Sequence, residues 1–348
     1  VAVGCKDENT EEIFEMKKNI LGLILTLSVV SLLFCGCGGQ QTETKVLRLA
    51  ETHNQDHITT QADLEFAKLV EEKSNGTIKI EVHTDGELGS EEEVLNQVYE
   101  NKLDFARISM STPSDIDVVE KVELPYIFRD RGHMQRAVKQ VAGPAIDLAM
   151  ADKNGKVLAY FESGARNLYT KKPIEKPEDF EGLRIRTYST SEFSADFFAM
   201  IGANPTPLDF SEIASSLEAN TIDGAENNTV SYYTSGHYKY APNLLKIEYR
   251  RIPDMLVMSR SLYNDLSQKE QDIINSAASE AALHQRNNWD DFEKGIEDKL
   301  RAEGVNITEP SEELTEFLKQ KAEFIYREIP KATDEDEVTL FEQLRGMQ

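Results

Sequence analysis

Cysteine is nearly absent from this chain of 348 residues: Cys5, Cys35 and Cys37 lie near the start, and no cysteine follows them. A disulfide framework, a cysteine-ligated metal and a thiol nucleophile are therefore excluded from the body of the protein. Basic side chains are also scarce, since 38 lysines and arginines face 62 acids and the net charge is −24. A field of that sign repels phosphate backbones and anionic lipid, which argues against a nucleic-acid-binding function.

The common catalytic motifs are missing as well. The sequence has no HExxH, GxSxG, P-loop or GxGxxG motif. His53 and His57 could bind a metal from one helix face, but the local pattern predicts a loop and no third ligand is near. We therefore expect no catalytic residue, no metal, no cofactor and no enzyme activity. The alternative is an extracellular enzyme acting on acidic sugars, which needs a general acid and base that no spacing here supplies.

The N-terminal residues resemble an export signal. Met-Lys-Lys-Asn at residues 16–19 precedes an uncharged apolar run, residues 20–34, which is shorter than the roughly 20 residues of a membrane span. The run ends in a sequence that resembles a bacterial lipobox, which implies cleavage before Cys37 and lipidation of that residue. A signal peptide cut elsewhere, or an uncleaved anchor, is the alternative. The expected order is an upstream extension (1–15), a lipoprotein signal peptide (16–36) and a polar tether (37–45).

Apolar patterns downstream predict an α/β fold. Strands are expected at residues 46–50 and 78–82, with a helix between them, which is typical of a parallel pair. Further strands are expected at residues 103–109, 157–162, 184–186 and 256–259, and a helix at residues 91–101. Ser267 and Glu270 fit a capping box that opens a helix running to about residue 302, long enough to bridge two domains. Open α/β sheets bind ligands beyond the carboxyl ends of their strands, so we expect the site there.

Two arginines near strand ends are candidate anion ligands. Arg166 follows the strand that ends near Glu162, and Arg186 shares a strand face with Arg184. A buried arginine is costly unless it meets a carboxylate, and its planar fork binds a carboxylate with two parallel hydrogen bonds. The carboxylate can belong to a ligand or to one of the chain's many acids. Spacing alone leaves both alternatives open.

A longer set of motifs makes residues 46–328 resemble the solute receptors of tripartite ATP-independent periplasmic (TRAP) transporters. They occur in the family's order and spacing: Gly86-Glu87-Leu88-Gly89, Leu124-Pro125-Tyr126-Ile127-Phe128, Gly164-Ala165-Arg166, Phe180-Glu181-Gly182-Leu183-Arg184-Ile185-Arg186, Gly202-Ala203-Asn204-Pro205-Thr206-Pro207 and Ile222-Asp223-Gly224-Ala225-Glu226-Asn227-Asn228. The resemblance implies a two-lobed venus-flytrap fold of mixed sheets flanked by helices and bridged by a long helix. Lobe I is expected to comprise residues 46–163 and 254–291, and lobe II residues 164–253 and 292–348.

The resemblance also implies a function and a set of site residues. Arg186 matches the family's main carboxylate anchor, with Arg166 and Asn227 beside it. The other candidates are Thr52, Ser109, Ser90, Phe210, Asn228, Glu51 and His53, which would meet ligand hydroxyl groups or line the pocket, and Arg107. The expected function is extracytoplasmic capture of a sugar acid, most like a hexuronate, for delivery to two integral membrane subunits, with the receptor attached only through its lipid. Because Arg107 could supply a second cationic end, a C4-dicarboxylate or keto-acid receptor is the alternative; an ABC-type or sensory binding protein is another.

Overall fold

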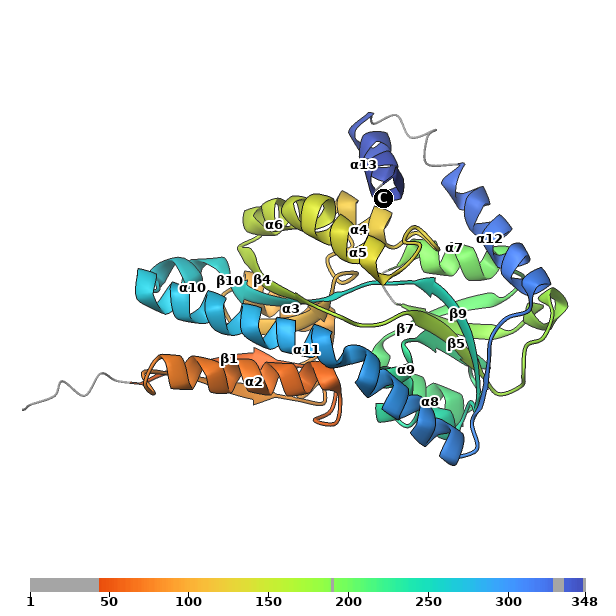
Figure 1. The fold of residues 1–348 in the computed structure, drawn as a ribbon, viewed down its shortest axis with the longest axis horizontal. Helices are drawn as coiled ribbons and strands as arrows, with labels where there is room; N and C mark the ends of the chain where they lie inside the picture. Colours follow the sequence, from red (N-terminus) through yellow and green to blue (C-terminus); the bar gives the residue numbers. More distant parts are fainter. Residues whose placement is uncertain (1–43, 189–190, 328–334, 347–348) are drawn as a thin grey trace, which may run out of the picture. The chain divides into compact units, whose positions relative to one another are not determined.

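The structure is a computed structural model that describes residues 44–188, 191–327 and 335–346. The expected upstream extension, signal peptide and lipidation site at Cys37 lie outside the described residues, as does the tether up to residue 43. Within the described ranges, no helix is long and apolar enough to span a bilayer. This part of the chain contains two β-sheets flanked by helices (Figure 1). The part built on the first sheet is called the first lobe below, and the part built on the second sheet the second lobe.

The first sheet has five strands in the order β2-β1-β3-β10-β4. β1 pairs in parallel with β2 and β3, whereas β10 is antiparallel to both β3 and β4. β10 returns to this sheet after the chain has built most of the second one, so the first lobe is discontinuous in sequence. The strands are β1 (Lys45–Ala50), β2 (Ile78–His83), β3 (Phe105–Ser109), β4 (Gly155–Phe161) and β10 (Asp254–Ser259).

The second sheet has six strands in the order β11-β9-β5-β8-β6-β7. β6 is parallel to β7 and β8, and β5 is antiparallel to β8 and β9. The strands are β5 (Arg166–Thr170), β6 (Arg184–Tyr188), β7 (Asn204–Leu208), β8 (Gly224–Asn227), β9 (Asn243–Arg250) and β11 (Asn306–Thr308).

Helices flank both sheets, and most of them connect one strand to the next along the chain. The helices of the first lobe and its neighbourhood are α2 (Ile58–Lys73), α3 (Glu91–Tyr99), α4 (Asp117–Val122), α5 (Arg131–Ala137), the π-helical η1 (Val138–Ala142), α6 (Gly143–Asp152) and α10 (Arg260–Asp265). Those that follow strands of the second sheet are η2 (Pro177–Phe180), α7 (Glu192–Met200), η3 (Phe210–Glu212), α8 (Ile213–Glu218), α9 (Thr229–Thr234), η4 (His237–Lys239) and α12 (Glu312–Tyr326), with α13 (Glu335–Gly346) nearest the C-terminus.

A single helix, α11 (Gln268–Ala302), serves both lobes. It packs along α2 and β4 of the first lobe and reaches α9 of the second, and Figure 1 shows it crossing the molecule. The predicted capping box is present, because Ser267 Oγ accepts from the Glu270 backbone while the Glu270 side chain accepts from Ser267. Small buried alanines between residues 277 and 282 let α2 approach closely. These features confirm the expected fold class of two mixed sheets bridged by a long helix.

The chain also passes between the sheets at residues 162–165 and 251–253. Gln285 of α11 holds the first of these segments, accepting from the Glu162 N–H at 3.0 Å and donating to its carbonyl at 2.7 Å. Gly164 has a positive φ of 67°, and a Cβ there would lie 2.8 Å from the Trp289 ring of α11. The crossing therefore requires glycine at this position.

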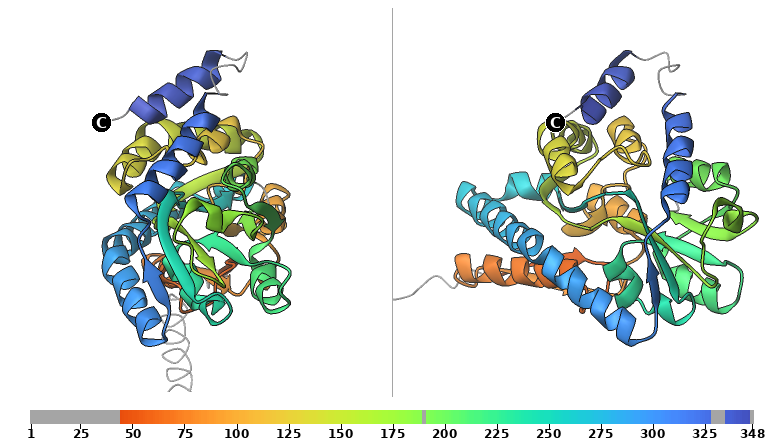
Figure 2. Two further views of the ribbon diagram at one scale, coloured as in Figure 1. Left: turned by 90° about the vertical axis from the view of Figure 1, so that its right-hand side faces the viewer. Right: turned by 45° about the vertical axis from the view of Figure 1, so that its right-hand side comes forward.

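The C-terminal helices do not stay on one lobe. α12 packs against α7, whereas α13 contacts α4 and η1, beside which it lies in the views of Figure 2. The residue limits given above for the two lobes stay a prediction.

Candidate ligand-binding site

The topology brings polar residues from both sheets to facing edges. Glu51 and Thr52 follow the end of β1, Ser109 ends β3, and Asp254 begins the antiparallel β10, so all four lie at one edge of the first sheet. In the second sheet, β6 and β8 end near Tyr188 and Asn227, and the antiparallel β5 starts at Arg166, at the same edge. This arrangement is the carboxyl-end crevice expected for an α/β protein.

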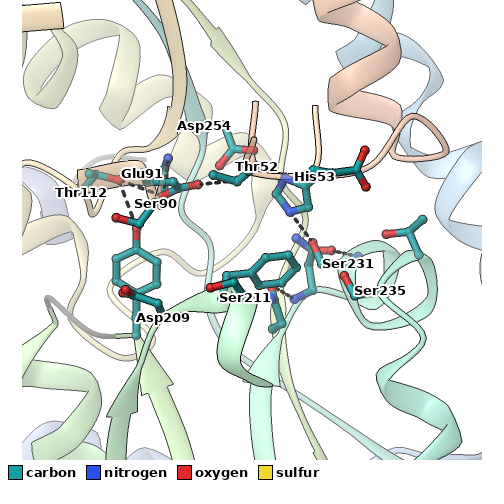
Figure 3. Close-up of a pocket in the computed structure, with 18 of the residues that line it drawn as sticks. Thr52, His53, Ser90, Glu91, Thr112, Asp209, Ser211, Ser231, Ser235 and Asp254 are labelled. Carbon is teal, nitrogen blue, oxygen red and sulfur yellow. Dashed lines mark hydrogen bonds between the residues drawn. The ribbon is translucent and has the colours of Figure 1, made fainter. Parts of the chain in front are cut away.

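A cavity of about 640 Å³ lies between these edges, lined by both lobes. Figure 3 shows Thr52, Glu91 and Asp254 on one side and Ser211, Ser231 and Ser235 on the other. Nine of the candidate residues line the cavity: Thr52, His53, Ser90, Ser109, Arg166, Arg186, Phe210, Asn227 and Asn228. The remaining two, Glu51 and Arg107, do not belong to its wall.

Arg186 is the lining cation with free hydrogen-bond donors. It is fully buried in β6, and its Nε donates to the Leu208 carbonyl at 2.8 Å. Among the described residues, neither terminal nitrogen has a hydrogen-bond partner; Nη1 lies 3.7 Å from the Glu226 carboxylate. Burial lowers the pKa of this guanidinium below its ordinary value, and Glu226 opposes the shift only in part. Buried donors without acceptors are costly, so these two nitrogens are candidates to bind the carboxylate of a ligand.

Arg166 is already paired. Its Nε and Nη2 donate to the two carboxylate oxygens of Glu226, the latter at 3.0 Å, and Nη2 also donates to the Glu226 carbonyl at 3.2 Å. Arg250 Nη2 lies 3.7 Å from the same carboxylate. Burial favours a raised pKa for Glu226, but Arg166 and Arg250 hold it below the ordinary value. The intramolecular salt bridge therefore accounts for Arg166 and not for Arg186. Arg250 Nη1 also lies 3.6 Å from the buried carboxylate of Glu123, so the three guanidiniums share two carboxylates.

Asn227 and Asn228 differ in the hydrogen bonds that their side chains make. Asn228 is the N-cap of α9: its Oδ1 accepts from the Ser231 N–H at 2.7 Å, and its Nδ2 donates to Ser163 Oγ at 3.3 Å. Asn227 Oδ1 accepts from the Asn228 N–H at 2.8 Å. The Asn228 side chain is thus occupied by the helix terminus, and the Asn227 amide NH₂ is the group with donors to offer. Phe210 also lines the cavity, and its ring centroid lies 5.0 Å from that of His53.

Arg107 and Glu51 form a buried pair beneath the cavity. Nε and Nη2 of Arg107 donate to the two oxygens of Glu51, and both side chains are fully buried. Although burial raises the pKa of Glu51, Arg107 pulls it well below its ordinary value. The expectation that Glu51 meets ligand hydroxyls and that Arg107 can offer a second cationic end does not fit this geometry. Neither residue lines the cavity, and Arg107 is paired with Glu51 because a buried guanidinium needs a carboxylate partner. Arg107 Nη2 also donates to Thr52 Oγ1 at 3.3 Å, and Glu51 Oε1 also accepts from the His53 N–H at 2.6 Å.

Two carboxylates that the sequence analysis did not select lie in the first-lobe wall. Glu91 Oε2 accepts from the Ser109 N–H at 3.1 Å and from Thr112 Oγ1 at 2.9 Å. Asp254 Oδ2 lies 3.1 Å from Arg107 Nη1, without hydrogen-bond alignment. Burial raises the pKa of Asp254 to about 6, with Arg107 opposing and Glu91 reinforcing the shift. Beside them, burial and Glu51 raise the pKa of Asp63 well above its ordinary value.

Hydrogen bonds also cross the cavity from one lobe to the other. Tyr188 of β6 donates its hydroxyl to Glu91 at 2.5 Å and lies 3.0 Å from the Thr112 hydroxyl. On the opposite side, Nε2 of His53 and Nε2 of His57 lie 3.1 and 3.2 Å from Ser231 Oγ. The two imidazole rings stack with centroids 4.0 Å apart. In the described part of the chain, no cluster of three or more histidine, cysteine and acidic side chains could hold a metal ion.

Comparison with known proteins identifies the family. The model described as "Bacterial extracellular solute-binding protein, family 7" matches residues 49–332. A solute-binding protein of Chromohalobacter salexigens is 35% identical over 246 residues, which cover 70% of this chain and 73% of that protein. The chain belongs to solute-binding family 7. Membership makes it an extracytoplasmic solute-binding protein of the TRAP type, a substrate-binding component of transport.

Solved family 7 structures share the whole described fold. A TRAP periplasmic solute-binding protein of Chromohalobacter salexigens, with bound D-glucuronate, superimposes with a TM-score of 0.81 at 30% identity and covers 87% of this chain and 100% of its own. One from Xanthobacter autotrophicus, with bound β-D-galacturonate, gives a TM-score of 0.80 at 29% identity and the same coverage. The sialic acid-binding periplasmic protein SiaP of Vibrio cholerae is 28% identical over 76% of this chain and 82% of its own length.

Strand periodicity is a signal that identifies Tyr188 as a further cavity-lining residue. It lies two residues after Arg186 and therefore on the same strand face, and its ring lies 5.6 Å from the Arg186 guanidinium. Glu91 lies in the first turn of α3, where a negative charge interacts favourably with the helix dipole, with Ser90 as the N-cap. A helix that begins at a sheet edge places that first turn in the crevice, so the same residue serves both purposes. Asp254 carries no local signal, because only β10 pairing brings it to the edge.

Proposed function

We propose that this family 7 protein captures a hexuronate outside the cytoplasm and delivers it to a TRAP permease. The observation that carries the proposal is that, among the described residues, the two terminal nitrogens of Arg186 have no hydrogen-bond partner. Arg186 lies in the wall of a cavity whose other side is lined by hydroxyl groups and acids. The ligand carboxylate would accept both hydrogen bonds from this planar fork. Its hydroxyls would meet Asn227, Ser109, Thr52 and His53. The relatives with bound glucuronate and galacturonate support the same ligand class.

Capture couples binding to closure. A ligand shifts the open–closed equilibrium only by its differential affinity for the two states. The carboxylate binds the second lobe, while the hydroxyls reach the first lobe only when the cavity is shut, so the closed state makes the additional contacts. Closure also excludes water and strengthens the charged hydrogen bonds to Arg186.

The lining residues disfavour the C4-dicarboxylate alternative. Among the described residues that line the cavity, the arginines are Arg166 and Arg186, both at the second-lobe end, and lysine is absent. Arg107, the candidate for a second cationic end, is bound to Glu51. Among the described residues that line the first-lobe side of the cavity, a second ligand carboxylate would therefore meet no arginine or lysine.

Calorimetric titration of the purified receptor domain tests the proposal. D-glucuronate and D-galacturonate should bind, whereas D-glucose and D-galactose, which lack the carboxylate, should not. Thermal unfolding gives an independent readout, since a ligand at about 100 times its Kd stabilises the folded state by about 2.7 kcal/mol. Tight binding of succinate or pyruvate together with no response to either uronate would contradict the assignment.

The attachment and the membrane partners belong to the same proposal. We propose that residues 16–36 direct export, that Cys37 is lipidated, and that one small and one large TRAP subunit receive the ligand. The lipobox-like sequence at Cys37 supports the anchor, and family membership supports the partners. Detergent-phase partitioning of the Cys37→Ser protein, expected to move from the membrane to the soluble fraction, tests the anchor. Uronate uptake into vesicles that contain both subunits, with and without the receptor, tests the partnership.

A further inference from the structure

The first-lobe wall of the cavity carries more acids than its one cation can balance. Around Arg107 lie the paired carboxylate of Glu51, Asp254 Oδ2 at 3.1 Å from Nη1, Glu91 Oε1 at 3.6 Å from Nη1 and Asp63 Oδ2 at 4.0 Å from Nε. Of these acids, Glu91 and Asp254 line the cavity. One guanidinium offsets one carboxylate, so the wall that faces the far end of the ligand is negative.

One of these lining acids also lacks a hydrogen-bond donor. The Asp254 side chain is 5% exposed, and within the described residues its Oδ2 has no hydrogen-bond partner. A buried carboxylate oxygen without a donor is costly, and a ligand hydroxyl would satisfy it. Glu91 presents a second acceptor beside it, held in place by Thr112 and by Tyr188. The wall therefore offers acceptors to hydroxyl donors.

We propose that Glu91 and Asp254 are specificity-determining residues, which accept hydroxyl groups of a sugar acid and reject any ligand that carries a second carboxylate. The inference rests on the proposed function and deepens it, because it restricts the ligand to polyhydroxylated monoanions. Rejection has a direct physical cause: two like charges a few ångströms apart repel strongly in a cavity from which water is excluded. The second lobe selects the charged end of the ligand, and the first lobe requires the other end to be neutral.

A matched pair of ligands isolates this effect. D-galactonate and galactarate have the same six-carbon chain and the same hydroxyls at C2–C5, and differ in whether C6 is a hydroxymethyl group or a carboxylate. Calorimetric titration of both, together with D-galacturonate, on the unmodified receptor should show galactarate binding at least about tenfold more weakly than galactonate. Asp254→Asn and Glu91→Gln keep the side-chain shape and remove one charge each. Each should raise the galactarate affinity relative to the monoanions by roughly tenfold or more.

A control and a structural alternative complete the design. Glu71→Gln removes a charge from an exposed residue of α2 that does not line the cavity, where water screens it, and should leave the ratio unchanged. A purely structural role for Asp254 or Glu91 would weaken all ligands equally and leave the ratio constant. Circular dichroism and thermal melts establish that each variant is folded, and two separate variants keep the test open if one fails to fold.

The outcomes separate the inference from the proposed function. Equal affinity of the unmodified receptor for galactarate and galactonate, or variants that gain no dianion affinity, would overturn the charge filter even if galacturonate binds tightly. Equal changes in Glu71→Gln and Asp254→Asn would overturn it too, because a general charge effect would then suffice. Failure of galacturonate to bind the unmodified receptor would sink the proposed function. In that case the filter stands only if the variants gain affinity for galactarate or succinate.

Discussion

Replacing Arg186 should separate ligand binding from the stability of the ligand-free protein. In Arg186→Met, a side chain of similar length removes the buried guanidinium whose terminal nitrogens have no partner among the described residues. Each unsatisfied buried donor costs about 1–3 kcal/mol, partly offset here by Glu226 at 3.7 Å. We therefore predict that the ligand-free variant is as stable as the parent or more stable, by up to about 3 kcal/mol. Loss of the carboxylate anchor should weaken hexuronate binding by about 2–5 kcal/mol, roughly 30- to several-thousand-fold.

Arg166→Met is the matched comparison, because it removes a similarly buried arginine from the same cavity wall. Glu226 then loses both side-chain hydrogen bonds from its bidentate partner and keeps only the more distant Arg186 and Arg250. Breaking a buried ion pair from one side costs about 3–5 kcal/mol. Urea unfolding of the two ligand-free variants, with calorimetric titration of each, measures both effects. Equal destabilisation by the two substitutions, or unchanged affinity in Arg186→Met, would refute the distinction drawn between the two arginines.

Three further substitutions probe other features. Burial raises the pKa of Asp254 from 3.8 to about 6 in the folded state. The stabilising contribution of this carboxyl group should therefore be present below about pH 4 and be lost as the pH rises through 6. In urea unfolding curves, Asp254→Asn should remove about 3 kcal/mol of this pH dependence. Tyr188→Phe deletes the hydroxyl that reaches Glu91 across the cavity at 2.5 Å and should weaken ligand binding by about 1–3 kcal/mol in calorimetry without unfolding the protein. Gly164→Ala places a methyl group 2.8 Å from the Trp289 ring at a positive φ and should lower stability by about 1–3 kcal/mol in thermal melts.

Each of these has an outcome that would contradict it. A constant stability difference between the parent and Asp254→Asn across pH 4–7 would mean that this carboxyl titrates normally in the folded state. Unchanged ligand affinity in Tyr188→Phe would show that the hydroxyl bond across the cavity does not favour the bound state. For Gly164, the control is Gly182→Ala, whose φ is also positive but whose Cβ would meet nothing within 4 Å. Equal losses at both positions would leave backbone strain alone as the cause.

Much of the architecture could be predicted from the sequence, because local sequence signals mark its helices and strands. The capping box at Ser267 marks the first residue of the bridging helix, and apolar alternation marks β1, β2 and β4. The carboxyl-end rule then predicts a crevice at the sheet edges between which the cavity lies. These features depend on residues close together in the chain, which is why they can be read without a structure.

What the sequence could not supply are pairings between distant residues. Arg107 and Glu51 are 56 positions apart, and Arg166 and Glu226 are 60 apart. Each pair forms because neighbouring strands of a sheet bring the two residues into contact. Spacing could show that both arginines were candidates. It could not show that Arg166 is hydrogen-bonded to Glu226 while the terminal nitrogens of Arg186 have no hydrogen-bond partner among the described residues. The same reason hides Asp254 and the hydroxyl of Tyr188, which enter the cavity only when β10 and β6 take their places.

The placement of charge has a consequence for the speed of capture. The full chain carries a net charge of −24, while the terminal nitrogens of Arg186, which have no hydrogen-bond partner among the described residues, are buried in the cavity wall. An approaching sugar-acid anion is repelled at long range and attracted only on arrival. Added salt screens the outer repulsion over a Debye length of about 8–10 Å but hardly reaches the enclosed fork. Raising ionic strength should therefore quicken association, the reverse of the behaviour of electrostatically steered receptors.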